Sequence, residues 1–156
     1  MPMNKTALAA LLAACFATAP APAQAATILF AVLNGANECD NTAAPAGPVC
    51  IKGDPDGIGS VTIISVSASL ACFAVTIDNV SAPAAMHIHS GGEATNGPVV
   101  IALAPIPASG NPGTSSGCVG GIAAGVLANI RNNPDLFYVN VHTPDFPGGA
   151  VRGQLF

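Results

Sequence analysis

Seven short stretches with the residue pattern of β-strands run through this chain of 156 residues, with turn-forming Gly, Pro, Asn and Asp between them. The chain holds 17 glycines and 14 prolines, which keep these stretches short. Alternation with a period of two is typical of β-strands that bury one face. The expected strands are residues 28–33, 59–66, 71–78, 85–89, 99–103, 136–142 and 150–156. Seven or eight such strands predict an antiparallel Greek-key β-sandwich.

A single segment has the pattern of a helix. Residues 122–130 carry apolar side chains at helical spacing, and Asn-Asn-Pro at 132–134 ends the pattern. This predicts one short crossover helix outside the sheet. Residues 36–57 and 104–120 are rich in Pro and Gly and are expected to be long loops. The predicted core comprises Phe73, Val75, Ile77, Ile88, Val139, Val141, Val151 and Leu155.

The N-terminus has the composition of an export signal. Lys5 precedes an apolar run over residues 7–19, and small residues at 23–25 precede Ala26, so residues 1–25 are predicted to be a cleaved signal peptide. Alternatively, residues 12–15 resemble a lipobox, which would leave Cys15 lipidated and the protein anchored in the envelope. Both readings predict an exported protein, periplasmic or secreted in the first case. The apolar run is too short to span a membrane, and no later run reaches 18 residues.

Cleavage of the signal leaves four cysteines in an oxidising compartment, which predicts two disulfides. Four cysteines allow three connectivities. We favour Cys39 with Cys50, because this pair closes a loop locally, and Cys72 with Cys118, where a loop could cover the face of the strand that carries Cys72. No two cysteines have the C-x-x-C spacing of a metal or redox motif, so a structural role is expected.

Residues 27–156 have the length of one domain with one core. This part carries three basic residues, Lys52, Arg131 and Arg152, against all eight acidic ones. An acidic surface argues against nucleic acid as a partner. The low charge and high apolar content also argue against disorder.

The three histidines of the chain lie in two of the predicted strands. In Met86-His87-Ile88-His89, alternation places the two imidazoles on one face, about 7 Å apart along the strand. In residues 137–142, Phe-Tyr-Val-Asn-Val-His, the valines form the apolar face, so His142 points to the polar side. The three imidazoles are therefore expected to share one site.

The last two strands can be aligned by matching their faces. If residues 143–149 form the connecting loop, His142 faces Ala150, Asn140 faces Arg152 and Tyr138 faces Gln154. Polar residues then meet polar residues, and apolar residues meet apolar ones. This register places Arg152 on the face of His142.

Several segments together resemble the CHRD domain, a module first described in chordin and common in exported bacterial proteins. Four motifs carry the likeness: AVLNGANE at 31–38, MHIHSGG through NGPVV at 86–100, FYVNVHT at 137–143 and GGAVRGQL at 148–155. The resemblance covers residues 27–156. It implies an exported β-sandwich without an established catalytic mechanism.

Two positions depart from the family pattern. Ala150 stands where the closing GEIRGQ strand of the family carries a glutamate, so any role of that carboxylate is absent here. Cys39-Asp40 replaces the Pro-Pro that follows the opening glutamate, which suggests a loop closed by a disulfide in place of a rigid turn.

The His-x-His on one strand, with a third His on another, also resembles the copper ligands of Cu/Zn superoxide dismutase, itself a Greek-key sandwich. Imidazole nitrogen binds copper, zinc or nickel, and three such ligands leave an open coordination position. Copper is the first choice and zinc the second. Glu93 or Asp145, each in the loop after a histidine strand, could supply a fourth ligand, and Asn140 and Arg152 could support the site from outside. Three histidines are too few for a bridged two-metal site.

Three functions remain open for an exported domain of this kind. The first is a non-catalytic protein with a three-histidine metal site, and the second is a module that binds another protein or a polymer without metal. The third, a metalloenzyme acting on superoxide or another small oxidant, ranks last because no catalytic triad or carboxylate pair is visible. In the second case no cofactor is required. The histidines would then fix loops through hydrogen bonds, and Arg152 would bind a carboxylate or loop carbonyls.

Overall fold

The computed structural model describes residues 26–38 and 53–156. The predicted signal peptide, the lipobox with Cys15, and the expected pair Cys39 and Cys50 lie outside these residues. No helix in the described part is both long enough and apolar enough to cross a membrane.

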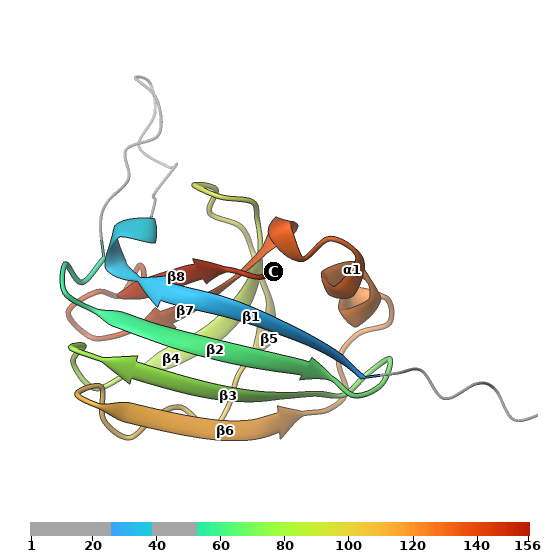
Figure 1. The fold of residues 1–156 in the computed structure, drawn as a ribbon, viewed down its shortest axis with the longest axis horizontal. Helices are drawn as coiled ribbons and strands as arrows, with labels where there is room; N and C mark the ends of the chain where they lie inside the picture. Colours follow the sequence, from blue (N-terminus) through green and yellow to red (C-terminus); the bar gives the residue numbers. More distant parts are fainter. Residues whose placement is uncertain (1–25, 39–52) are drawn as a thin grey trace, which may run out of the picture.

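Eight strands form one antiparallel sheet that folds over on itself (Figure 1). Neighbouring strands follow the order β5-β4-β7-β8-β1-β2-β3-β6. The strands are β1 (Thr27–Asn34), β2 (Ile58–Ser65), β3 (Ala71–Asp78), β4 (Ala85–Ser90), β5 (Val99–Ala102), β6 (Gly113–Val119), β7 (Phe137–His142) and β8 (Val151–Gln154). The predicted antiparallel all-β sandwich is confirmed.

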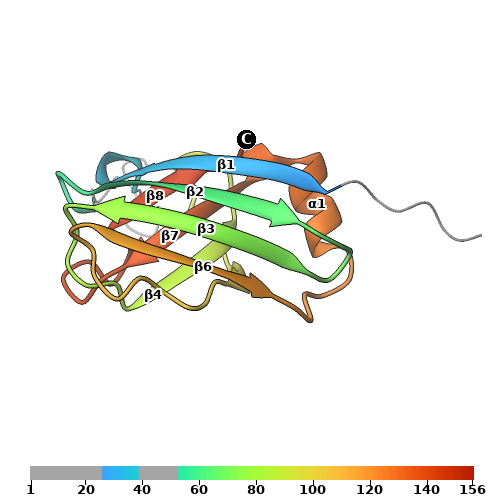
Figure 2. The ribbon, with the colours of Figure 1, turned by 60° about the horizontal axis from the view of Figure 1, so that its bottom comes forward.

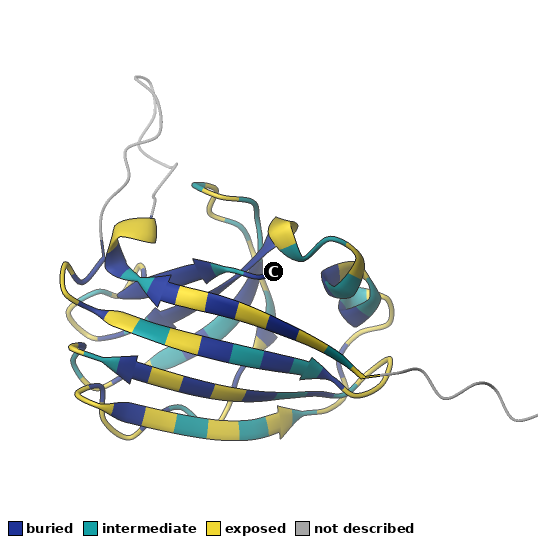
Figure 3. Ribbon diagram, in the orientation of Figure 1, coloured by how far each residue is buried: buried dark blue, intermediate teal, exposed yellow. Residues whose placement is uncertain are grey.

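The sheet makes two layers, with β1, β2, β3 and β6 on one side and β4, β7 and β8 behind them (Figures 1 and 2). Buried and exposed residues alternate along the strands of the first layer, as Figure 3 shows. β7 is different, because five of its six residues are buried, so that both faces of the strand are covered. All eight residues predicted for the core are buried: Phe73, Val75, Ile77, Ile88, Val139, Val141, Val151 and Leu155.

One strand escaped the sequence prediction. Residues 104–120 were expected to form a loop, yet β6 lies within them and pairs with β3. Its sequence, GTSSGCV, carries small polar residues because β6 lies at the end of the strand order and exposes alternate side chains. A strand that pairs with one neighbour and has a solvent-exposed face needs few apolar residues, so the alternation of apolar and polar residues did not identify β6.

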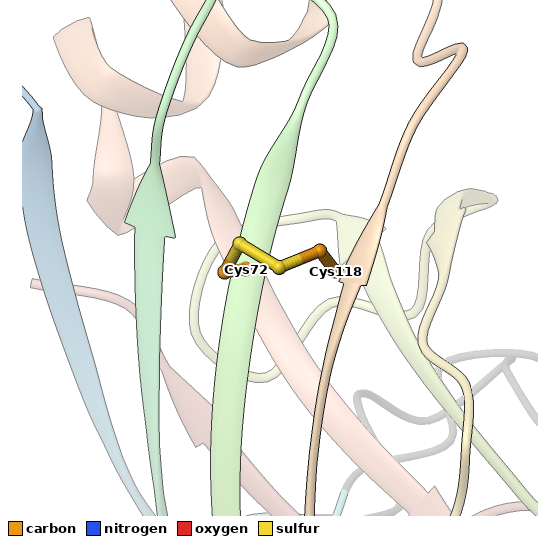
Figure 4. The surroundings of a disulfide bond; sticks show 2 residues. All are labelled: Cys72 and Cys118. Carbon is orange, nitrogen blue, oxygen red and sulfur yellow. A yellow bond between two sulfur atoms is a disulfide. The ribbon is translucent and has the colours of Figure 1, made fainter.

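The disulfide between Cys72 and Cys118 is present, with the sulfur atoms 2.02 Å apart (Figure 4). The two cysteines are register partners on β3 and β6. The predicted pairing is therefore correct, although Cys118 lies on a strand and not on a covering loop.

The helix and two short 3-10 segments complete the described chain. α1 (Val126–Asn132) follows β6 and buries Leu127 and Ile130, so the predicted crossover helix is confirmed. The guanidinium of Arg131 on α1 donates a hydrogen bond to the Ser65 hydroxyl of β2 at 2.6 Å. Of the 3-10 segments, η1 (Gly35–Asn37) follows β1 and η3 (Pro134–Leu136) leads into β7.

Candidate metal site

The polar faces of β7 and β8 meet in the predicted register. Asn140 lies opposite Arg152 and Tyr138 opposite Gln154. These side chains are not open to solvent, because Tyr138 is 1% and Asn140 2% exposed. The loop between β4 and β5 covers them, and its Gly97 N–H donates to the Tyr138 hydroxyl oxygen at 3.2 Å. The site is thus a polar layer enclosed between a sheet face and its loops.

β4 brings the histidines to this layer. Met86 and Ile88 enter the core, so His87 and His89 point to the other face of β4. His87 lies opposite Asn140 on β7, and His89 lies opposite Tyr138.

The three imidazoles come together as the sequence predicts. The ring centroids of His87 and His142 are 5.1 Å apart, those of His87 and His89 are 5.6 Å apart, and those of His89 and His142 are 6.0 Å apart. One nitrogen from each ring lies within 4.8 Å of the others. In the part of the chain that the structure describes, no other group of His, Cys, Asp or Glu has this arrangement.

Two of the rings are held in a defined orientation by backbone carbonyls. His89 Nδ1 lies 2.9 Å from the Gly97 oxygen, and His142 Nδ1 lies 3.0 Å from the Pro147 oxygen. Because a carbonyl only accepts, each Nδ1 must carry the proton, which leaves Nε2 with its lone pair. The Nε2 atoms of His89 and His142, together with His87 Nδ1, are buried without a hydrogen-bond partner. Metal-binding histidines are typically fixed in this way.

Burial keeps the three rings neutral. It is the largest cause that lowers the pKa of His87, His89 and His142 below the usual 6.5. The positive charge that His142 would carry lowers the pKa of His87 further. At pH 7 the site therefore offers unprotonated imidazoles, which is the form that binds metal.

The spacing fits a single transition-metal ion after a small contraction. Zinc binds imidazole nitrogen at about 2.0–2.1 Å, which places the nitrogens of a tetrahedral site about 3.4 Å apart. Closing the present spacing requires shifts of about an ångström, which rotation of the rings about their side-chain bonds can supply. Three imidazoles leave one coordination position open.

Arg152 and Tyr138 form the wall of the site beside His89. The Tyr138 ring stacks on His89, with centroids 4.8 Å apart and planes 9° apart. The Arg152 guanidinium carbon lies 3.4 Å from the centre of the same ring, a cation–π contact.

Arg152 fixes the β4–β5 loop. It is 1% exposed and donates to the carbonyl oxygens of Gly92 and Thr95 at 2.9 and 3.0 Å, and to Asn96 Oδ1 at 3.1 Å. Its donors are therefore engaged within the protein, as expected if Arg152 is a structural residue that binds loop carbonyls. Gln154 on the same strand donates to the Gly91 carbonyl at 2.8 Å and supports the same loop.

The carboxylates suggested as a fourth ligand lie outside the histidine group. Glu93 and Asp145 are both exposed, and neither belongs to the group of three. Asn140 is buried, and its Nδ2 donates to Glu38 Oε2 at 3.3 Å.

Glu38 is the residue of this layer that residue patterns did not identify. It follows η1 and is 4% exposed. Burial raises its pKa from 4.5 to about 7, although the positive charge of Arg152 and the hydrogen bond from Asn140 both act to lower it. The sequence feature that could have identified Glu38 was its place at the end of the AVLNGANE motif, where this carboxylate fits neither the periodicity of a strand nor that of a helix.

Comparison with curated proteins gave no match, and comparison with solved structures gave none either. A family model does match, over residues 29–155, which includes every strand of the sandwich except the first two residues of β1. The histidine strands, Arg152 and Glu38 all lie within this match. The chain therefore belongs to the CHRD domain family.

Proposed function

We propose that this protein is an exported, non-catalytic CHRD-domain protein that binds one transition-metal ion through His87, His89 and His142. The observation that carries the proposal is the orientation of the rings. The Nδ1–H groups of His89 and His142 donate to backbone carbonyls, each of the three rings keeps one buried nitrogen without a partner, and one nitrogen of each ring lies within 4.8 Å of the others. Unpartnered buried polar atoms are costly, and an ion that accepts all three lone pairs removes this cost.

Copper is the first choice of metal and zinc the second. Copper(II) lies above zinc in the general order of affinity for nitrogen ligands, and both accept three imidazoles. Asn140 and Arg152 support the site from outside, the first beside His87 and the second through Tyr138.

The test is metal content and affinity of the purified, disulfide-bonded protein. Wild type should retain about one Cu²⁺ per chain after dialysis. His87→Ala, His89→Ala and His142→Ala should each reduce the affinity for Cu²⁺ far more than the about 10- to 100-fold reduction caused by removing a residue that only supports a ligand. Thr76→Ala, on the exposed face of β3, is the matched control and should bind like wild type. Unchanged binding in all three histidine variants would contradict the proposal and leave the rings a structural role.

A second candidate, an interaction module without metal, draws on the outer face of the first layer. There β1 exposes Ile28, Phe30 and Val32. Single exposed apolar residues are ordinary, but three on one face of a strand are unusual where that face is only solvated. A partner protein or polymer would bind there, and binding would survive removal of the histidines.

Export rests on the N-terminal segment. A soluble form should begin at Ala26, whereas a lipoprotein should begin at a lipidated Cys15. Mass spectrometry of the protein from periplasmic and membrane fractions of a bacterial host distinguishes the two. Intact residues 1–25 in cytoplasmic protein would refute export.

A further inference from the structure

Glu38 is buried against backbone and polar groups, with 4% of its surface exposed. The backbone of Gly149 lies directly over its carboxyl group, since a Cβ at position 149 would come within 2.5 Å of both Cδ and Oε1. Gly53 packs against the stem, where a Cβ would lie 2.8 Å from the Glu38 Cγ. Two glycines thus let two loops close over one carboxyl group, and water is kept from it.

The hydrogen bonding around Glu38 is incomplete for an ionised carboxylate. The hydrogen bond from Asn140 reaches Oε2, while Glu38 Oε1 and Asn140 Oδ1 are both buried without a partner. An ionised carboxylate has no donor to offer to the amide oxygen. A protonated carboxyl group does, because its O–H can donate to Asn140 Oδ1 once the amide group is turned over.

The charges around Glu38 come from four elements. On β8, Arg152 attracts the ionised form, and Glu93 in the β4–β5 loop attracts Arg152 in turn. Asp54 and Asp145 lie in the two loops that carry Gly53 and Gly149, and, in addition to burial, the negative charge of Asp145 contributes to raising the pKa of Asp54. On β7, Asn140 lies between Glu38, to which it donates a hydrogen bond, and the histidine strand, because it is the register partner of His87 on one side and of Arg152 on the other.

We propose that binding of a divalent ion at the three histidines converts the buried Glu38 from a protonated carboxyl group to a carboxylate, so that metal uptake and release of this proton are coupled. The inference rests on the proposed metal function and extends it. The O–H bond of Glu38 breaks, the electron pair stays on the carboxyl oxygen, and the proton passes to solvent buffer. The ion adds two positive charges to a face that already buries Arg152, and Glu38 is the carboxyl group placed to balance them.

The expected number of protons follows from the free-state ionisation. With a pKa of about 7, Glu38 is about half protonated at pH 7 and about nine-tenths protonated at pH 6. Metal binding should therefore release up to about 0.5 proton from Glu38 at pH 7 and up to about 0.9 at pH 6. The histidines contribute little at pH 7, because their pKa values lie below 6.5.

The composition offers a direct test. The chain has two glutamates, Glu38 and Glu93, so protein labelled with [13C]glutamate gives two carboxyl signals, and Glu93→Gln assigns them. Zn²⁺ is the probe because it is diamagnetic. At pH 6 the Glu38 signal should move from the protonated to the ionised position on addition of one equivalent of Zn²⁺, while exposed Glu93 serves as the internal reference.

Each outcome is decisive. If Zn²⁺ shifts the imidazole signals but Glu38 stays protonated, the coupling is refuted and the metal site stands. If the imidazole signals do not move, both proposals fail. Calorimetric titration of Zn²⁺ in two buffers of different ionisation enthalpy adds a proton count, and Glu38→Gln should bind Zn²⁺ with about 0.5 fewer protons released at pH 7 than wild type. An equal count in the two proteins would overturn the inference. The labelled wild type decides the question if the variant does not fold.

Discussion

Replacing Arg152 by Met should destabilise the domain more than any other substitution of a single charge. The apolar stem of the side chain is kept, and the three hydrogen bonds to Gly92, Thr95 and Asn96 are lost, as is the contact with the Tyr138 ring. Each hydrogen bond from a charged donor contributes about 1.5–3 kcal/mol, and the cation–π contact about 1–2 kcal/mol. Part of this sum is offset, because the variant no longer has to remove the charged guanidinium from water when it folds. After this offset, we expect Arg152→Met to lower the free energy of unfolding by about 3–5 kcal/mol.

The measurement is urea denaturation of the disulfide-bonded protein without metal. Arg131→Met is the matched control, because Arg131 makes one hydrogen bond to Ser65 and lies partly exposed on α1. It should cost about 1 kcal/mol. A free energy of unfolding for Arg152→Met within about 1 kcal/mol of that for Arg131→Met would show that Arg152 does not hold the loop as described.

Three further predictions concern Glu38, its cover and the disulfide. Folding raises the pKa of Glu38 from 4.5 to about 7, so its contribution to stability is full below pH 4.5 and is lost as pH rises through about 7. Relative to wild type, the free energy of unfolding of Glu38→Gln should therefore rise by about 2.5 kcal/mol between pH 5 and pH 8 without metal, and a difference in urea denaturation that does not change with pH would contradict this. Gly149→Ala should lower the free energy of unfolding by about 2 kcal/mol or more, because the added Cβ meets the Glu38 carboxyl group and φ is +142°. In the control Gly148→Ala the added Cβ meets no atom within 4 Å, so stability should hardly change, and equal melting temperatures of the two variants would refute the enclosure of Glu38. Replacing Cys72 and Cys118 together by Ala should lower the free energy of unfolding by about 2–4 kcal/mol, since the bond closes a loop with a sequence separation of 46, and an unchanged denaturation midpoint would show that the cross-link adds nothing.

Alternation carried the sequence prediction furthest where one strand face is apolar. The bounds of β3 were predicted to the residue, and so was the register of β7 on β8, because Val141 and Val151 must both enter the core. The convergence of the three histidines followed from the same argument. β6 was missed because a strand at the end of the order, built from Gly, Ser and Thr, has no apolar face to detect.

The sequence could not predict what covers the polar face. Tyr138 and Asn140 were expected to be polar-side residues, and their near-complete burial depends on loops that return from other parts of the chain. Glu38 lies 102 positions from its hydrogen-bond partner Asn140. Local periodicity contains no information about contacts at that separation, so the buried carboxyl group became visible only in the folded structure.

The stacking of Tyr138 on His89 gives the protein a built-in optical signal. The chain contains one tyrosine and no tryptophan, so its tyrosine fluorescence comes from a single ring in the wall of the histidine cluster. A paramagnetic ion such as Cu²⁺ bound beside that ring would quench the emission, and a closed-shell ion such as Zn²⁺ would leave it largely intact. Occupancy and identity of a bound ion can thus be read from the unlabelled protein, without a dye or an introduced reporter residue.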